Sequence, residues 1–394
     1  MSKQSSTADS RESTGAAHSH WPQLFERALV IDDRRRHGLS NRGERAVNIA
    51  GGVLMLAFAI GWVWSFANAR TLSAAVPAGT ARTLATALTS SNAPSTAYLT
   101  EAALLAITDR ILGPARGTSG KLRATFQAEP GAIPTDTARE AIRYERGGEV
   151  ATAPKGAGIW RVLIAFGNAM RPVSNYNVIA LTPFSAKKNG RVGLYYIGNW
   201  PTERGAAGPS KAPSGAYAPP AGFIEVTREN KDTKVSEHFK LADFLTHDQP
   251  NVWPKYLVLQ QKLVDKLELV LSDLQSHGHD ISGVTVMSGF RTPQYNAGGG
   301  NTGGRANLSR HMYGDASDIF IDSNHDGQMD DLNHDGKVSI DDSRVIEAAV
   351  DRVEKAHPEF IGGAGVYTAA SGHGPFIHID TRGYRARWMG TSGG

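Results

Sequence analysis

The chain contains no cysteine among its 394 residues, which excludes disulfide bonds, thiol catalysis and cysteine-ligated zinc. It has no segment in which dense basic residues alternate with aromatic ones, and its formal net charge of +4 is small for this length. Nucleic-acid binding is therefore not expected. The hydrophobic content of 40% is enough to build real cores, and the length is typical of two folded units with tails. Any metal site must use histidine, aspartate or glutamate.

Charge is also absent from Ala46 to Ala67, a nearly continuous apolar run. A membrane-spanning helix needs roughly 20 such residues. Several arginines lie between Arg34 and Arg45, and Arg70 follows the run, so the positive-inside rule places the N-terminus in the cytoplasm. We therefore expect a disordered cytoplasmic tail over 1–45, then a single-pass transmembrane anchor over 46–69 in the cytoplasmic (inner) membrane. The C-terminal domains would then be periplasmic or extracellular.

The segment Ala67-Asn68-Ala69 leaves one alternative open, because it has the small-x-small form of a signal-peptidase site. Cleavage after Ala69 would release the rest of the chain. The polar lead and the apolar core are both longer than in a signal peptide, which favours an uncleaved signal anchor.

Beyond the anchor, residues 70–155 mix short helical patterns with turns and predict a stalk or linker. From Gly158 onward, short runs rich in β-branched and aromatic residues are separated by turn signals such as Lys188-Asn189-Gly190. These runs predict a small β domain over 156–225.

The remaining residues, 226–394, alternate helical and strand patterns. Val235–Phe244 and Lys255–His277 have helical periodicity, and Val284–Met287 has the composition of a strand. The fold class predicted for the whole exported part is therefore α+β.

Two segments suggest a metal site. The stretch Ser309–Asp318 and the stretch Phe376–Asp380 together offer two histidines and a carboxylate. Three nitrogen and oxygen ligands that leave a fourth position open for water are typical of a catalytic zinc site.

Four segments occur in a characteristic order: Ser288–Asn296, Ser309–Ile319, Gly362–Tyr367 and Phe376–Trp388. They resemble the zinc D-alanyl-D-alanine carboxypeptidase family, which shares its fold with the Hedgehog signalling domain. The similarity is closest to small bacterial members, some of which have an N-terminal β domain. The resemblance implies a Hedgehog/DD-peptidase-like zinc domain over 226–394.

By this resemblance, His311, Asp318 and His378 are the zinc ligands. Arg291 aligns with the family arginine that contacts a carboxylate or carbonyl of the substrate, with a structural salt bridge as the alternative. The family's acidic general base stands three positions before the last histidine. Here that position is Pro375, which cannot serve.

Other groups are candidates for the missing base. His373 aligns with a second family histidine, and its ordinary pKa lies near neutrality. Asp315 and Asp380 are carboxylate candidates, although Asp380, two residues after His378 on the same strand face, more naturally orients that histidine. The alternative is a site that binds zinc without catalysis.

An acidic insert over 322–342 predicts calcium binding, with a solvated loop as the alternative. Its second half matches the EF-hand loop pattern, and an overlapping copy starts nine residues earlier. The candidate ligands are Asp322, Asn324, Asp326, Asp330, Asp331, Asn333, Asp335, Ser339 and Asp342.

The leading hypothesis is a membrane-anchored, exported zinc metallopeptidase that hydrolyses peptidoglycan stem peptides, as a D,D- or L,D-carboxypeptidase or endopeptidase. The alternative is a non-catalytic metal-binding module that binds cell-wall peptide or a protein partner. The bond that is cut, the role of the β domain and the oligomeric state do not follow from the sequence.

Overall fold

The computed structural model describes residues 112–128, 142–166, 169–203, 215–298, 306–370 and 373–390, together with Gly52 and Met55. The chain divides into two compact units, residues 1–80 and 81–394, and every element named below belongs to the second. The tail predicted over 1–45 lies outside the described residues, as does the anchor predicted over 46–69 apart from Gly52 and Met55.

Among the helices of the described residues, none is both long and apolar enough to cross a membrane.

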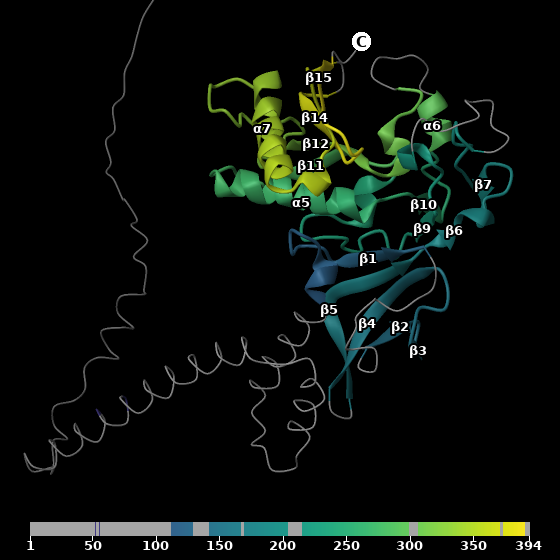
Figure 1. The fold of residues 1–394 in the computed structure, drawn as a ribbon. Helices are drawn as coiled ribbons and strands as arrows, with labels where there is room; N and C mark the ends of the chain where they lie inside the picture. The colour runs from purple at the N-terminus through teal and green to yellow at the C-terminus, as the bar shows by residue number, and fades with distance from the viewer. Residues whose placement is uncertain are drawn as a thin grey trace, which may run out of the picture. The chain divides into compact units, whose positions relative to one another are not determined.

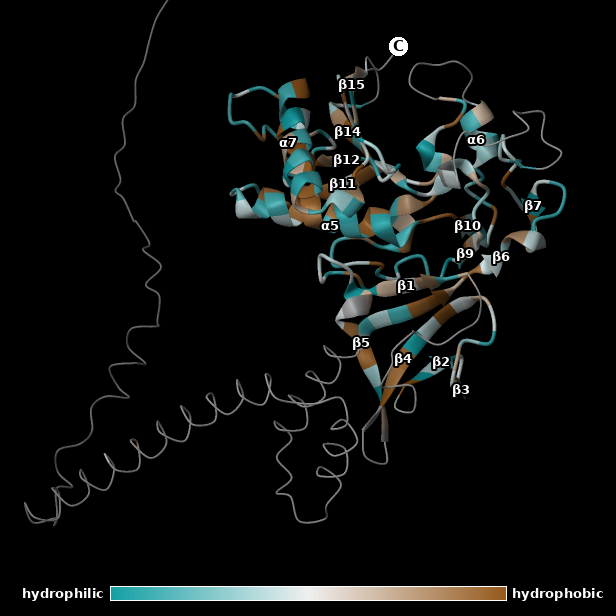
Figure 2. Ribbon diagram, viewed as in Figure 1, coloured by the Kyte–Doolittle hydropathy of each residue, from teal (hydrophilic) through white to brown (hydrophobic). Residues whose placement is uncertain are grey.

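The fold of the described residues is mixed α/β, with several sheets and few helices (Figure 1). The first sheet has the order β1-β5-β4-β2-β3, with β1 parallel to β5 and the other pairs antiparallel. Hydrophobic residues are prominent on β4 and β5 (Figure 2), and every second residue from Trp160 to Ile164 and from Tyr176 to Ala180 is buried in one cluster. Its strands are β1 (Ala124–Gln127), β2 (Ile142–Arg146), β3 (Glu149–Ala151), β4 (Gly158–Phe166) and β5 (Ala169–Ala180).

Strands β1, β2 and β3 correct the prediction of a stalk over 70–155. Each of them pairs with a strand of the same sheet, and the partners of β1 and β2 lie further along the chain, in β5 and β4. The tendency of a segment to form a strand depends on packing against such distant partners. A short window of sequence therefore does not reveal these strands.

The middle of the chain contains short elements. Strands β6 (Thr182–Pro183), β9 (Gly222–Val226) and β10 (Lys255–Leu257) form an antiparallel sheet of order β10-β9-β6. Strands β7 (Arg191–Val192) and β8 (Tyr195–Tyr196) form a separate hairpin.

The two predicted helices in this part were partly wrong. Within Val235–Phe244 only a 3₁₀ helix forms, at Leu241–Phe244, because the backbone N–H of Val235 bonds the carbonyl of Phe239 in a tight turn. The range Lys255–His277 divides into β10 and the helix α5 (Gln261–Ser276). In the second range, pairing of β10 with β9 has overridden helical periodicity.

The third sheet positions the site. It has the order β11-β12-β14-β13-β15, and α7 (Ile340–Ala356) packs against β13, β14 and α5. On β12 and β14, Ile319, Ile321, Ile377 and Ile379 are fully buried in the main hydrophobic core. The strands are β11 (Val284–Ser288), β12 (Ala316–Ile321), β13 (Gly363–Tyr367), β14 (Phe376–Asp380) and β15 (Ala386–Gly390).

Candidate metal centre

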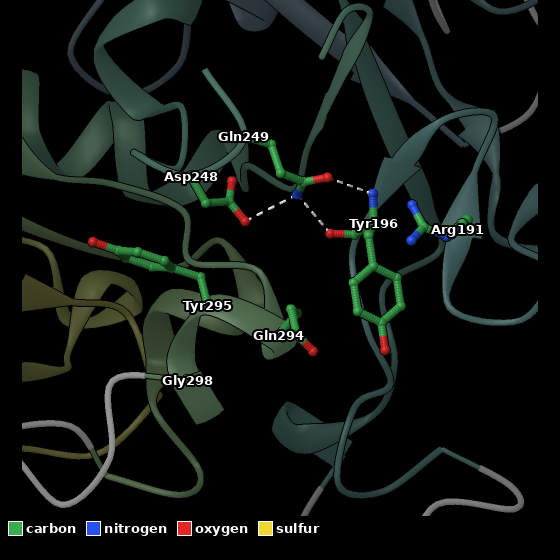
Figure 3. A pocket seen from close by; sticks show the side chains of 7 residues that line it. All are labelled: Arg191, Tyr196, Asp248, Gln249, Gln294, Tyr295 and Gly298. Atoms are coloured by element: carbon green, nitrogen blue, oxygen red, sulfur yellow. Dashed lines mark hydrogen bonds between the residues drawn. The ribbon is translucent and has the colours of Figure 1, made fainter. Parts of the chain in front are cut away.

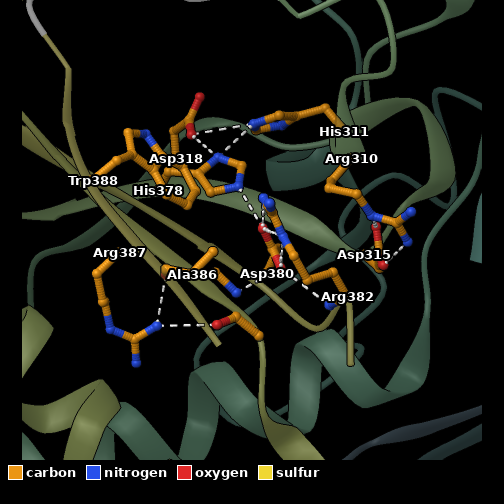
Figure 4. A network of polar contacts seen from close by, with 12 residues as sticks. Arg310, His311, Asp315, Asp318, His378, Asp380, Arg382, Ala386, Arg387 and Trp388 are labelled. Carbon is orange, nitrogen blue, oxygen red and sulfur yellow. Dashed lines mark hydrogen bonds and ion pairs between the residues drawn. The ribbon is translucent and has the colours of Figure 1, made fainter. Parts of the chain in front are cut away.

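Three buried side chains converge in the third sheet, as Figure 4 shows. Nε2 of His311 lies 3.2 Å from Oδ1 of Asp318 and 3.1 Å from Nδ1 of His378. Nδ1 of His378 lies 2.9 Å from the same oxygen of Asp318. In the described part of the chain, this is the one group of three or more His, Asp or Glu side chains arranged to hold a metal ion. The structure therefore brings together the three predicted ligands.

The alternation of β12 and β14 places two of these ligands. Asp318 and His378 are direct partners across the two antiparallel strands. Since neighbouring residues of a strand point to opposite faces, burial of Ile319 and Ile377 in the core turns Asp318 and His378 to the other face. The register of the sheet thus sets the distance between them.

His311 comes from a different element, the 3₁₀ helix at Arg310–Tyr313. Gly314 ends that helix in the left-handed region, at φ 68°, and a Cβ there would lie 2.4 Å from the carbonyl oxygen of Val258. Glycine is therefore required at this turn, which leads the chain from His311 into β12.

Hydrogen bonds on the far side of each histidine determine which ring nitrogen carries the proton. Nδ1 of His311 lies 2.6 Å from the carbonyl oxygen of Gly289, which can only accept, so Nδ1 is the protonated nitrogen. Nε2 of His378 lies 3.1 Å from Oδ2 of Asp380 and donates to this carboxylate. The lone pairs of His311 Nε2 and His378 Nδ1 therefore face the centre, where Oδ1 of Asp318 also lies. Three acceptor atoms this close together fit a bound cation.

Arg291 is paired with a candidate metal ligand. Its Nη2 donates to Oδ2 of Asp318 at 2.5 Å, and its Nε donates to Oγ of Ser288 at 2.8 Å. Burial alone would raise the pKa of Asp318, but His311 and Arg291 hold it well below its usual range. The structure thus shows the salt bridge that the sequence left open for Arg291, and this bridge leaves Oδ1 of Asp318 directed at the centre.

The two histidines differ in how easily they are protonated. Burial, together with the charge of Arg291, lowers the pKa of His311 to about 4, so this ring is neutral near pH 7. Burial would also lower the pKa of His378, but hydrogen bonds to Asp318 and Asp380 and the charges of both carboxylates raise it overall. In the protein without metal, a proton therefore competes for Nδ1 of His378 and must leave when a metal binds.

Asp380 hydrogen-bonds a candidate ligand, the arrangement that its spacing from His378 favours, and its catalytic role stays a prediction. Its carboxylate lies on the edge of the His378 ring opposite Nδ1, where it also accepts from the backbone N–H of Gly363 at 2.7 Å and from Nε of Arg382. Burial would raise the pKa of Asp380, but the hydrogen bonds to His378 and Arg382 lower it. The carboxylate is therefore ionised and held in place.

Asp315, the other carboxylate candidate, is bound by Arg310. Nε of Arg310 donates to Oδ1 of Asp315 at 3.0 Å, and Nη2 of Arg310 bonds the other oxygen. Both side chains are buried. The pair fixes the loop between His311 and β12, and it does not present a carboxylate to the metal centre.

We expect Asp380→Asn to weaken metal binding by about 10- to 100-fold, the usual effect of changing a group that orients a metal ligand. The amide cannot reproduce both the acceptance from His378 and the charge that Arg382 requires. Titration of the metal-loaded protein with a competing chelator measures the affinity. Glu359→Gln, at an exposed carboxylate beside His357, is a matched control that should leave the affinity unchanged. An unchanged affinity in Asp380→Asn would contradict the assigned role.

Trp388 is a contact of the site that sequence reasoning missed. Its ring centroid lies 5.3 Å from that of His378, and its Nε1 donates to the hydroxyl of Tyr367 at 2.9 Å. Gly365 lies between them in register, opposite both His378 and Trp388, and a Cβ there would lie 2.2 Å from the indole. Gly365, within Gly363–Tyr367, was the signal available in the sequence, because a residue without a side chain permits the indole of Trp388 to pack on the ring of His378.

His373, the predicted proton carrier, belongs to the aromatic cluster next to the site. Its ring packs edge-on against Phe376, with centroids 5.1 Å apart, and Phe376 stacks on Tyr367 at 4.6 Å. Its Nδ1 donates to the carbonyl of Gly374 at 2.7 Å, so the lone pair of the neutral ring is on Nε2. This is the tautomer that a general base at Nε2 requires.

The acidic insert forms two loops with the same conformation. In each, the first aspartate accepts two backbone N–H groups, so Asp322 bonds residues 326 and 327 as Asp331 bonds residues 335 and 336. His325 and His334 both adopt φ 60°. The predicted calcium ligands are thus engaged in hydrogen bonds within their own loops, and the structure lends no support to calcium.

Two of those predicted ligands also have another role. Ser339 caps α7, and Asp342 bonds the backbone N–H of Ser339 at 2.7 Å and that of Leu332 at 2.8 Å. Ser339-x-x-Asp342 is therefore a capping box, a pattern that was present in the sequence but was interpreted as calcium ligation.

Comparisons with protein-family models, with curated proteins and with solved structures found no match for this chain.

Proposed function

We propose that this chain is a zinc-dependent peptidase with a Hedgehog/DD-peptidase-like domain. The observation that carries the proposal is the convergence of Nε2 of His311, Nδ1 of His378 and Oδ1 of Asp318, with each histidine fixed in the tautomer that ligation needs. Two imidazoles and one carboxylate are a donor set that suits zinc, and three protein ligands are the number found in catalytic zinc sites.

A zinc ion held by these residues supplies Lewis-acid polarisation of a carbonyl and a water of lowered pKa. The chain's own groups supply the remaining functions. Arg291 holds Asp318 in place, and Asp380 keeps the proton of His378 on Nε2. His373 accepts a proton at Nε2 and returns it to the leaving amine.

The substrate class that we propose is the stem peptide of peptidoglycan, cut as a D,D- or L,D-carboxypeptidase or endopeptidase. It rests on the four sequence segments and on the proposed outward orientation behind a membrane anchor. The zinc domain would then act on the far side of the cytoplasmic membrane, where this polymer lies.

A specific observation favours a second candidate, a metal-binding module without catalysis that holds cell-wall peptide or a protein partner. Pro375 occupies the position of the family's acidic base, and the nearby carboxylates of Asp315 and Asp380 are engaged by Arg310 and by His378 and Arg382. Catalysis therefore depends on His373.

His373→Gln separates the two candidates. For the peptidase we expect kcat for release of D-alanine or for cross-link cleavage to fall by about 10²- to 10⁴-fold, as when general acid–base help is lost. Zinc affinity should not change. Mass spectrometry of peptidoglycan fragments incubated with the full-length protein measures the products, and His357→Gln, at a partly exposed histidine after α7, is the matched control. Intact fragments with the wild-type zinc protein would favour the binding module.

Calcium in the acidic insert stays a prediction. Oxygen ligands at alternating positions suit a hard cation, and bound calcium would relieve repulsion among the carboxylates. We expect millimolar calcium to raise the Tm of the full-length protein and Asp331→Ala to remove that increase. A Tm that is independent of calcium would mean that backbone hydrogen bonds alone hold the two loops.

A further inference from the structure

Two cavities lie in succession beside the metal centre. The smaller, of about 160 Å³, is lined by residues that include Ser288, Arg291 and Tyr295. The larger, of about 650 Å³, shares Tyr295 with it and extends to the β7–β8 hairpin (Figure 3). Arg291, which lines the smaller cavity, bonds Asp318, so that cavity adjoins a candidate ligand, and Tyr295 separates it from the larger one. The larger volume is typical of a ligand pocket.

The wall of the larger cavity is held in place without a ligand. The side-chain amide of Gln249 accepts from the backbone N–H of Tyr196 at 2.9 Å and donates to its carbonyl at 2.8 Å, so it pairs with β8 as a strand would. The backbone N–H of Gln294 bonds the carbonyl of Ile197 at 2.9 Å. A Cβ on Gly198 would lie 2.8 Å from the nitrogen of Gln294, so the hairpin and α6 (Pro293–Gly298) meet at closest approach.

The acidic group of the cavity is already satisfied. Asp248 is the one acidic residue among the described residues that line it. Oδ1 of Asp248 accepts from the hydroxyl of Tyr195 at 3.0 Å, and Oδ2 accepts from Thr292 at 3.2 Å and from Gln249 at 3.0 Å. Behind this wall, Nζ of the buried Lys255 bonds the carbonyl oxygens of residues 248 and 249.

The basic group of the cavity faces outward. Arg191 is exposed, and its guanidinium lies over the ring of Tyr196 at 4.6 Å from the centroid. Its Nη1 donates to the carbonyl of Leu194 at 3.0 Å. A guanidinium carries five N–H donors in a fork that matches a carboxylate, and stacking on an aromatic ring holds the fork in place. The cavity therefore offers a positioned cation together with the amide of Gln294 and two tyrosine rings.

We infer that the larger cavity binds a carboxylate-bearing residue of an extended peptide whose reacting bond lies at the metal centre, with Arg191 as the partner of the carboxylate. This inference rests on the proposed function for the position of the reacting bond. It assigns Arg191 as a specificity-determining residue. It also predicts that the protein recognises a residue of the peptide that is not adjacent to the bond that is cut.

The test measures binding and cleavage separately with the zinc-loaded full-length protein. The probes are N-acetylated pentapeptides that end in D-alanyl-D-alanine and carry glutamate at successive positions, each compared with its glutamine counterpart. At one position we expect glutamate to bind about 10- to 100-fold more tightly, the value of a hydrogen bond to a charged group. Arg191→Gln should remove that preference and leave the affinity for the glutamine peptide unchanged. Arg171→Gln, at an exposed arginine of β5, is the matched control.

The outcomes distinguish this inference from the proposed function. A glutamate preference that depends on Arg191, without cleavage, would keep the cavity as a peptide site and remove the peptidase. Cleavage without any glutamate preference, or with one that Arg191→Gln does not change, would overturn the role of Arg191. A peptide linked to the peptidoglycan disaccharide that binds more tightly through Tyr196 and independently of Arg191 would also overturn it, because the cavity would then recognise the glycan.

Discussion

We expect His311→Ala to abolish stoichiometric zinc binding and, with it, the peptide hydrolysis that we propose. The variant loses one of three ligands, so its zinc affinity should fall by more than about 100-fold, the upper end of the effect of losing a group that only orients a ligand. The contacts of Asp318 also change. Its Oδ1 loses the imidazole of His311, while its Oδ2 keeps the bond to Arg291. Elemental analysis of the dialysed full-length protein measures the bound zinc, and mass spectrometry of peptidoglycan fragments measures the activity.

The matched control for this variant is His357→Ala, which removes a partly exposed histidine outside the described metal centre. It should retain both zinc and activity. If His311→Ala still bound one equivalent of zinc with unchanged affinity, the centre formed by His311, Asp318 and His378 would not be the metal site. Loss of zinc with full retention of activity would instead remove the zinc mechanism.

Lys266→Met is the second change with a large expected effect, because it breaks a buried ion pair behind the site. Nζ of the fully buried Lys266 donates to Oε1 of Glu354 at 2.7 Å and to the backbone carbonyl of Asp380 at 2.7 Å. Removing Lys266 deprives the buried carbonyl of Asp380 of this donor and leaves Glu354 with Arg387 as a charged partner, so the change should cost about 1–3 kcal/mol in the free energy of unfolding. The substitution also affects β14, the strand that carries His378, because Lys266 of α5 bonds the backbone of that strand.

Urea denaturation of the full-length protein measures this loss, and Asp351→Asn provides the matched comparison. Asp351 belongs to the outer part of the same network, where it pairs with Arg385 and Arg387 and is partly exposed. Exposed ion pairs contribute about 0–1 kcal/mol, so Asp351→Asn should change stability little. Equal losses in the two variants would contradict the assignment of the buried pair as the main support of β14.

The candidate ligands could be predicted because His311, Asp318 and His378 stand in the short segments that carry the family resemblance. Alternation along β12 and β14 explains why Asp318 and His378 meet.

The groups that surround the ligands were harder to foresee. Two of these groups belong to the backbone, the carbonyl of Gly289 and the N–H of Gly363, and residue type does not indicate which backbone groups contact a site. Trp388 and Lys266 act through contacts between elements far apart in the chain. Arg291 was recognised as important, and the structure adds its salt bridge with Asp318, while its substrate contact stays a prediction.

The pairing of Asp318 with His378 across β12 and β14 has a consequence for how the domain reaches its native state. Side chains alternate between the two faces of a strand, so a shift of β14 by one residue would turn His378 toward the core and Ile377 toward Asp318. A sheet misaligned in this way would turn His378 away from Asp318 and would hold a metal ion less tightly. A bound ion would therefore favour the native register of β12 and β14 over a shifted one.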